Sequence, residues 1–423
     1  MHKKNAFVAT FIAIGVVLIT ILIVACKVNY KKPIIIWTNQ AEFTTYAELF
    51  NASQDTVKAV VVYKKSPVES FPPSEDEETP DIVIGKWLKN EKIRRNFMPI
   101  DYLFTDQHIN KYIFYPQLLS LGNIDNKQYL LPVSFNLPAI VFSNKNKDIV
   151  KTNYMISPDQ IRDTASLVNI SEKDSYTKMG FAPRWTPEFL YQMMKIMGAD
   201  FKESADIFSW NQEAVNNTIK YLRDWTVNSN TSTNAETDYK FKYLYTPELD
   251  WIYSNRSLFA YTTSNKLFQV TPEKLKTLDY RWLDKDDKIY IDDDIISMGI
   301  YKYSKNIPAA EHFLIWFMNE DNQKTMLKWK ESLNLYTRTF GIADGFSSIQ
   351  SVNERVYPIF YQGLFGNLPI AETLKTPNIL PAKWESIKER ILIPYMEAAI
   401  DTENTDKKIS IQALLNNWKK QFF

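Results

Sequence analysis

Apolar residues recur along the chain in two patterns that predict strands and helices in turn. Runs of strand length are found at Ile34–Trp37, Val57–Tyr63, Ile82–Ile84, Tyr129–Val133 and Ala139–Phe142. Between the first two runs, one face of a helix is predicted by the spacing of Phe43, Tyr46, Ala47 and Phe50. Strands that alternate with helices favour an open α/β sheet, which binds ligands beyond the carboxyl ends of its strands.

The second half of the chain carries helix signals. Thr186 and Pro187 can begin a helix that Gly198 ends. Ser209 and Gln212 have the spacing of a capping box, which predicts another helix start. A last helix is predicted by the spacing of Ile411, Leu414, Leu415 and Trp418. We interpret six tryptophans as core residues: Trp210, Trp225, Trp282, Trp316, Trp384 and Trp418.

Length and charge restrict the class of protein. A chain of 423 residues is longer than one core usually supports, so two lobes are expected. The 50 Lys and Arg nearly balance the 49 Asp and Glu, which gives no general field to attract nucleic acid. We therefore expect a neutral or locally recognised ligand, no nucleic-acid partner and a monomeric protein.

The N-terminus predicts export and a membrane tether. The basic residues MHKKN precede Ala6–Ala25, a stretch without charge that is typical of a signal peptide or a spanning helix. The only cysteine, Cys26, follows directly and resembles the lipidated cysteine of bacterial lipoproteins. A lipid anchor at Cys26 and an uncleaved helix both remain open. Either alternative places residues 27–423 outside the cytoplasm, in the periplasm or at the cell surface, and tethered to the membrane.

Few residues suit catalysis or metal binding. The three histidines, His2, His108 and His312, are too few and too scattered for a Ser/His/Asp triad or a zinc site. Asp292–Asp294 is expected to be solvated rather than to bind calcium. We expect no cofactor, no metal and no enzymatic activity, although a glycosidase pair of carboxylates stays an alternative.

Several segments, in their order along the chain, resemble the extracellular solute-binding proteins of carbohydrate importers, the maltose-binding-protein superfamily. Three strings in the second lobe, FLYQMMKIMGADF, FSWNQEAVNNTIKYLRDW and SNRSLFAYTTSN, add to the resemblance; Arg256 departs from it because the family usually has Gly there. The strings that carry most of it are PIIIWTNQAEFTTYAELF, PDIVIGKWL with MPID, NKQYLLPVSFNLPAIVFSNKN and SMGIYKYSKNIPAAEHFLIWFMNEDNQ.

The resemblance implies a periplasmic-binding-protein-like α/β fold with two lobes, a ligand cleft and a hinge of crossovers near Ser143 and Ser297. It implies a leader over residues 1–26, a first lobe over 33–143 with 298–340, and a second over 144–297 with 341–423. The implied function is the substrate-binding component of an ATP-binding-cassette (ABC) importer that binds a carbohydrate reversibly and delivers it to transmembrane subunits.

The resemblance also implies the ligand contacts, because sugars stack on aromatic rings and pair their hydroxyls with polar side chains. Each tryptophan has a competing interpretation as a core residue, and Asn39 and Asn136 can form local turns instead. Arg184 can pair with a surface acid, and Lys86 is a further candidate. The predicted contacts are Trp37, Asn39, Gln40, Trp87, Ser134, Phe135, Asn136, Arg184, Trp185, Thr263 and Asn265.

Other ligands and roles stay open from the sequence. A peptide, a polyol phosphate or a lipid-like compound are rival ligands. A tethered protein that serves a sensor or receptor is a rival role.

Overall fold

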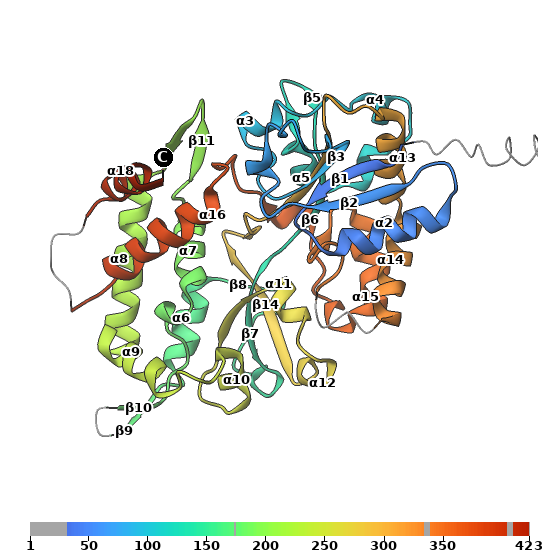
Figure 1. Ribbon diagram of the computed structural model, residues 1–423. Coiled ribbons are helices and arrows are strands. Elements are labelled where there is room, and N and C mark those ends of the chain that lie inside the picture. Colours follow the sequence, from blue (N-terminus) through green and yellow to red (C-terminus); the bar gives the residue numbers. More distant parts are fainter. Residues whose placement is uncertain (1–31, 173–174, 334–338, 404–408, 423) are drawn as a thin grey trace, which may run out of the picture.

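The computed structural model describes residues 32–422 except 173–174, 334–338 and 404–408. The leader and Cys26 therefore lie outside the described residues. Two six-stranded sheets organise the described chain, and Figure 1 shows them side by side with helices around each. We call the part built on the first sheet lobe 1 and the part built on the second sheet lobe 2.

The sheet of lobe 1 has the strand order β17-β6-β16-β3-β1-β2. β1 pairs in parallel with β2 and with β3, so the carboxyl ends of these three strands meet at one edge. β1 is buried along its whole length, which explains its continuous apolar run. The bounds are β1 Ile34–Thr38, β2 Ala59–Tyr63, β3 Ile82–Gly85, β6 Leu131–Phe135, β16 Ile296–Ile300 and β17 Phe346–Ser347.

Helix α2 (Glu42–Ser53) confirms the first predicted helix. It buries the predicted residues Phe43, Tyr46, Ala47 and Phe50. Their rings pack on α13 (Ile307–Phe317): the Phe43 and Phe317 centroids are 5.3 Å apart, and those of Phe50 and Phe313 are 5.1 Å apart. α14 (Glu320–Ser332) lies beside them in Figure 1. This apolar contact fixes α2 beside the loops that leave β1 and β2.

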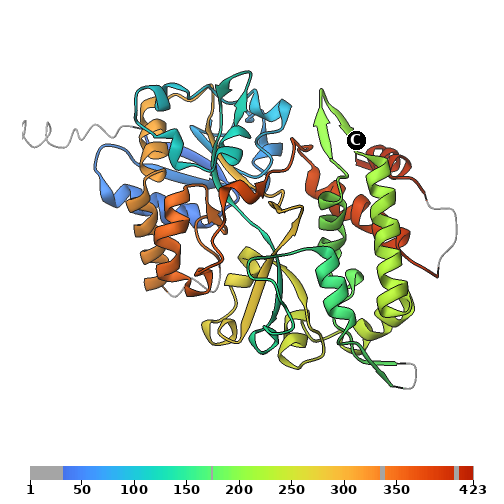
Figure 2. The same cartoon turned by 180° about the vertical axis from the view of Figure 1, so that it is seen from behind.

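The sheet of lobe 2 has the order β13-β7-β14-β15-β18, with β8 paired to β14. Figures 1 and 2 show helices α6, α7 and α8 beside this sheet, on the side away from lobe 1. The strands are β7 Pro138–Ser143, β8 Met155–Ile156, β13 Ala260–Thr263, β14 Leu278–Lys285, β15 Lys288–Tyr290 and β18 Leu374–Lys375; the helices are α6 Pro158–Ser166, α7 Pro187–Ile196 and α8 Gln212–Asn230.

The helix starts in lobe 2 confirm one prediction and correct another. α7 begins at Pro187 after Thr186, and Gly198 follows its end with a φ of +94°. α8 begins at Gln212, but its cap is Asn211, whose side chain accepts a hydrogen bond from the Ala214 amide. The predicted capping box at Ser209 is therefore wrong, because Ser209 belongs to strand β12 (Ile207–Ser209).

The chain crosses between the sheets three times. β6 and β7 belong to different sheets, so the first crossing is at Asn136 and Leu137, earlier than Ser143. β15 and β16 also belong to different sheets, which places the second crossing directly before β16. β17 pairs in lobe 1 and β18 in lobe 2, so the third crossing lies between them. Residues 341–347 thus belong with lobe 1, unlike in the predicted division.

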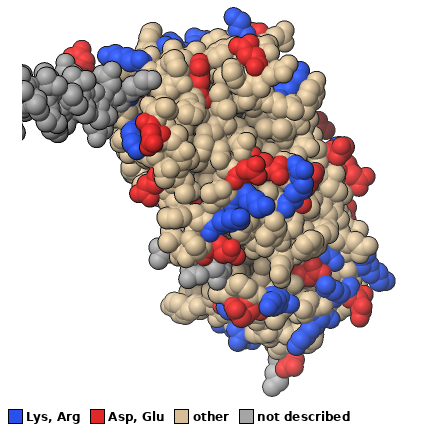
Figure 3. Space-filling model, turned by 90° about the vertical axis from the view of Figure 1, so that its right-hand side faces the viewer, with Lys and Arg blue, Asp and Glu red and all other residues tan. Residues whose placement is uncertain are grey.

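Aromatic side chains pack along these crossings. The Trp282 and Phe346 ring centroids are 5.8 Å apart, and Phe268 and Phe340 stack at 4.8 Å. Among the other predicted core tryptophans, Trp225 and Trp384 are also fully buried. Charged side chains of both signs are interspersed on the face shown in Figure 3, in agreement with the balanced composition.

Candidate functional site: a cavity between the lobes

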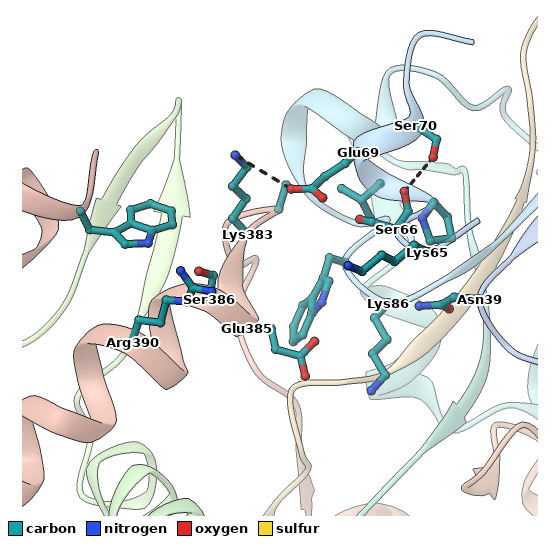
Figure 4. A pocket seen from close by; sticks show the side chains of 15 residues that line it. Asn39, Lys65, Ser66, Glu69, Ser70, Lys86, Lys383, Glu385, Ser386 and Arg390 are labelled. Carbon is teal, nitrogen blue, oxygen red and sulfur yellow. Dashed lines mark hydrogen bonds and ion pairs between the residues drawn. The ribbon is translucent and has the colours of Figure 1, made fainter. Parts of the chain in front are cut away.

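The two lobes face each other across a cavity of about 550 Å³. The lobe 1 wall consists of the loops that follow β1, β2 and β3, so it stands at the carboxyl edge of the sheet. The lobe 2 wall faces it in Figure 4. The lining residues are Asn39, residues 65–70, Lys86 and Trp87 from lobe 1, and Ala382, Lys383, Glu385, Ser386, Arg390 and Trp418 from lobe 2.

Asn39 and Gln40 lie together at the end of β1. Asn39 lines the cavity, and its side-chain oxygen accepts a hydrogen bond from Gln40 Nε2 at 2.9 Å. The Gln40 amide donates to Thr38 Oγ1 at 3.0 Å. Gln40 therefore does not line the cavity but holds the side chain that does.

Trp87 has an unusual backbone. Its φ is +63°, a left-handed conformation that bulky residues rarely adopt. Such a conformation persists only where the surrounding structure determines it, and it is frequent at binding sites. The Trp87 side chain lines the cavity while most of its surface is buried. This loop therefore presents an aromatic ring in a fixed position.

Charges of both signs line the cavity. Lys86 Nζ lies 3.0 Å from Asp294 Oδ2, and the Asp294 charge raises the pKa of Lys86, so its ammonium persists at neutral pH. Across the cavity, Lys383 Nζ lies 4.0 Å from Glu69 Oε1 (Figure 4). Amide, hydroxyl and charged groups together with two tryptophans provide both the paired donors and acceptors and the flat apolar faces that a sugar needs.

The lobes also meet beside the cavity, where the hairpin of β11 (Lys202–Ser204) and β12 (Ile207–Ser209) reaches α3 (Glu91–Arg94). Asn90 Nδ2 donates a hydrogen bond to Glu203, and the Ala205 amide donates to Glu91 Oε2 at 3.1 Å. Lys92 and Asp206 form an ion pair at 3.4 Å. Burial raises the pKa of Glu203. These contacts join the two walls.

The prediction that Asp292–Asp294 is solvated is wrong for Asp293, while Asp292 and Asp294 are partly exposed. Asp293 is buried, pairs with Lys195 Nζ at 2.6 Å and accepts a hydrogen bond from Trp384 Nε1 at 2.9 Å. Burial, with the nearby Asp294 charge, raises the pKa of Asp292 to about 7. In the described part of the chain, no group of three or more His, Cys, Asp or Glu residues could hold a metal ion.

Lys89 lies in the same loop as Trp87 and is 6% exposed. Its ammonium is buried, makes no hydrogen bond to another described residue, and faces the charges of Asp293 and Lys195. Desolvation lowers its pKa to about 8. The loop after β3 therefore contributes a ring to the cavity and a destabilised ammonium to the contact between the lobes.

The structure brings five of the predicted contacts together at the first crossing rather than at the cavity. Asn136 Nδ2 donates to the Asp344 carbonyl at 2.9 Å, and Asn136 Oδ1 accepts from Ser264 Oγ at 2.6 Å. Asn265 Nδ2 donates to Asp344 Oδ2 at 2.9 Å, and Asn265 Oδ1 accepts from Thr263 Oγ1 at 2.6 Å.

The other two residues of that group, Ser134 and Phe135, are buried in β6. Ser134 Oγ donates to the Ala343 carbonyl at 2.9 Å. The Phe135 ring packs on Tyr115 at 5.3 Å and on Phe346 at 5.6 Å. The polar groups of this crossover cluster (Ser134, Asn136, Thr263, Asn265 and Asp344) are thus engaged with one another and with the backbone.

Three predicted contacts lie away from the cavity; Trp37 and Trp185 are buried, and Arg184 is partly buried. Trp37 is 0% exposed, with the Lys64 ammonium 4.1 Å from its ring. The Trp185 ring stacks on Tyr239 at 5.5 Å, and its Nε1 donates to a backbone carbonyl at 3.3 Å. Arg184 precedes it, and its Nη1 is buried without a hydrogen-bond partner among the described residues. None of the three lines the cavity.

Much of the cavity wall was not predicted. Trp418 was interpreted as a core residue; it is indeed only 8% exposed, but it also lines the cavity. The loop of residues 65–70 and the segment 382–390 carried no signal of ligand binding. The mixed polar composition of both segments is the only trace that sequence offers, and it is common in surface loops.

The two sheets, the three crossings and the cavity between the lobes define a periplasmic-binding-protein-like fold, which confirms the predicted fold class.

No family model matches the chain, and no curated protein matches it. The described residues include no helix that is both long and apolar enough to span a membrane.

Solved structures with this fold include several sugar-binding proteins. CpMnBP1 with mannotriose bound is 12% identical with a TM-score of 0.58, covering 92% of this chain and 99% of that chain. The ABC substrate-binding protein Lmo0181 from Listeria monocytogenes, in complex with cycloalternan, is 14% identical with a TM-score of 0.59 (92% and 98%). The GacH receptor of Streptomyces glaucescens, solved with acarbose, is 13% identical with a TM-score of 0.60 (92% and 97%). At these identities the likeness establishes the fold.

Proposed function

We propose that this protein is the extracytoplasmic substrate-binding component of an ABC importer and binds a carbohydrate reversibly by closure of its two lobes. One observation carries the proposal: a cavity of about 550 Å³ between the lobes, within the size range of small-ligand sites and lined by aromatic and polar side chains. The sugars named for the similar structures, mannotriose, cycloalternan and acarbose, support the ligand class.

The partners and the location belong to the same proposal. The protein acts as a monomer that delivers its sugar to the transmembrane subunits of the importer. It is tethered outside the cytoplasm through a lipid on Cys26 or through the preceding apolar segment. The Cys26→Ser variant distinguishes these two forms of anchor. If a lipid on Cys26 is the anchor, the variant is released from washed membranes; if the apolar helix is retained, the variant stays in the membranes.

Ligand screening tests the binding proposal. A soluble form that begins at residue 27 is heated with a panel of mono- and oligosaccharides, peptides and polyol phosphates, because a bound ligand stabilises the folded state by mass action. We expect sugars to raise the unfolding temperature and to be recovered with unchanged mass. Stabilisation by peptides alone, or conversion of the sugar to a product, would contradict the proposal.

A further inference from the structure

A second cavity of about 340 Å³ adjoins the first one. Three residues, Ala382, Lys383 and Trp418, line both cavities, so the two spaces meet at these side chains. The second cavity is lined by Asn90 and Lys92, by the β11–β12 hairpin, by the segment 381–387 and by helix α18 (Ile411–Phe422). Nothing in the proposed sugar site requires this additional space.

Most polar side chains of the second cavity are engaged with other side chains of the protein. Asn90 donates to Glu203, and Lys92 pairs with Asp206 at 3.4 Å. Gln412 Nε2 donates to Asn416 Oδ1 at 3.0 Å. Lys419 is solvent-exposed.

Apart from Lys383, which pairs with Glu69 at 4.0 Å, the remaining lining is apolar. It consists of Phe208, Pro381, Ala382, Ile387, Leu415 and Trp418. A cavity whose charged side chains are mostly paired or solvent-exposed and whose other walls are apolar favours an apolar occupant, because displacement of water from such walls is favourable.

We propose that the second cavity binds an apolar substituent of a glycoside whose sugar part occupies the first cavity. This assignment rests on the proposed function and narrows its ligand class to sugars that carry an alkyl, acyl or aryl group. Trp418 is the specificity-determining residue, since its side chain lines both spaces and can contact the sugar on one side and the substituent on the other.

Titration calorimetry with matched glycosides tests the assignment. Methyl and hexyl glycosides of mannose, glucose and maltose are compared on the protein from residue 27 onwards. For a sugar that binds, we expect the hexyl form to bind at least tenfold more tightly, with a more negative heat-capacity change from the additional apolar burial. Equal affinities would overturn the assignment and leave the proposed function intact, whereas no binding of any sugar would overturn both.

A blocking variant localises the effect. Gln412 and Asn416 are both exposed on α18, but only Gln412 lines the second cavity. We expect Gln412→Trp to reduce the hexyl advantage to less than twofold with methyl glycosides unchanged, and Asn416→Trp to change neither. Loss of affinity for long unsubstituted oligosaccharides in Gln412→Trp, with the hexyl advantage retained, would make the cavity an extension for sugar units and overturn the apolar assignment.

Discussion

The cavity wall and the crossover cluster contain the same kinds of residue but use them differently. In the wall, Asn39 and Trp87 line open space. In the cluster, Asn136 and Asn265 are hydrogen-bonded to Asp344. The amide side chains of the cluster are paired across the crossover and hold the lobes together, whereas Asn39 is paired with the adjacent Gln40 and still faces the cavity. Whether a polar residue at a strand end binds ligand or holds the crossover is therefore decided by the groups that it contacts.

Lys89, in the loop that carries Trp87, gives the largest expected effect. Its pKa is about 8 in the folded protein and near 10.5 when solvated, so the folded state binds fewer protons than the unfolded state between these values. Wild-type stability should therefore rise between pH 8 and 10.5, and the full cost of the buried ammonium is present below pH 8.

Lys89→Met removes this cost, on the order of 3 kcal/mol at 1.36 kcal/mol for each pKa unit. We expect the variant to be more stable than wild type at pH 7 by denaturant unfolding, and its advantage to shrink as the pH rises towards 10.5. An advantage that does not depend on pH would show that Lys89 is solvated in the folded protein. Lys145→Met, at an exposed lysine, is the control.

Trp87→Ala tests the cavity wall. Removal of a ring that stacks on the ligand should weaken binding by about 2 kcal/mol, or roughly thirtyfold in Kd. Calorimetry on folded protein measures the change, and Trp329→Ala, at an exposed tryptophan of α14, should leave Kd unchanged. An unchanged Kd for a folded Trp87→Ala variant would remove Trp87 from the site.

Asn136→Ala tests the crossover cluster. It leaves the Asp344 carbonyl and the Ser264 hydroxyl without their partner, so stability should fall by about 1.5 kcal/mol. Affinity for the ligand should stay within twofold of wild type. Asn144→Ala, which removes an exposed hydrogen bond, should cost less. Lost affinity with unchanged stability would place Asn136 in direct contact with the ligand.

Glu69→Gln is expected to have the smallest effect on ligand affinity. The Glu69 and Lys383 side chains are 53% and 36% exposed, so their ion pair across the cavity contributes about 0.5 kcal/mol or less. We expect Kd to rise about twofold at low salt and the difference to vanish at high salt. Glu48→Gln on the exposed face of α2 should have no effect at either ionic strength.

The sequence predicted lobe 1 better than lobe 2, for a physical reason. Ile34–Trp37 and the stripe from Phe43 to Phe50 are periodic and local, and the loop after a buried parallel strand must open at the sheet edge. These local patterns are enough to predict that Asn39 and Trp87 lie at the sheet edge that faces the cavity. The lobe 2 wall comes from a segment near residue 385 and from Trp418, which approach lobe 1 only through long-range packing. A buried helix face looks the same in sequence whether it meets a core or a cavity.

The three passages of the chain between the lobes restrict how the lobes can move. Two bodies joined by one strand can twist and swing in any direction, but three links set side by side and packed with aromatic rings resist torsion and sideways slip. Rotation about the line through the links meets the least resistance. Opening would then be a rotation about a single axis, and the two walls would return to the same alignment after each cycle of release and capture.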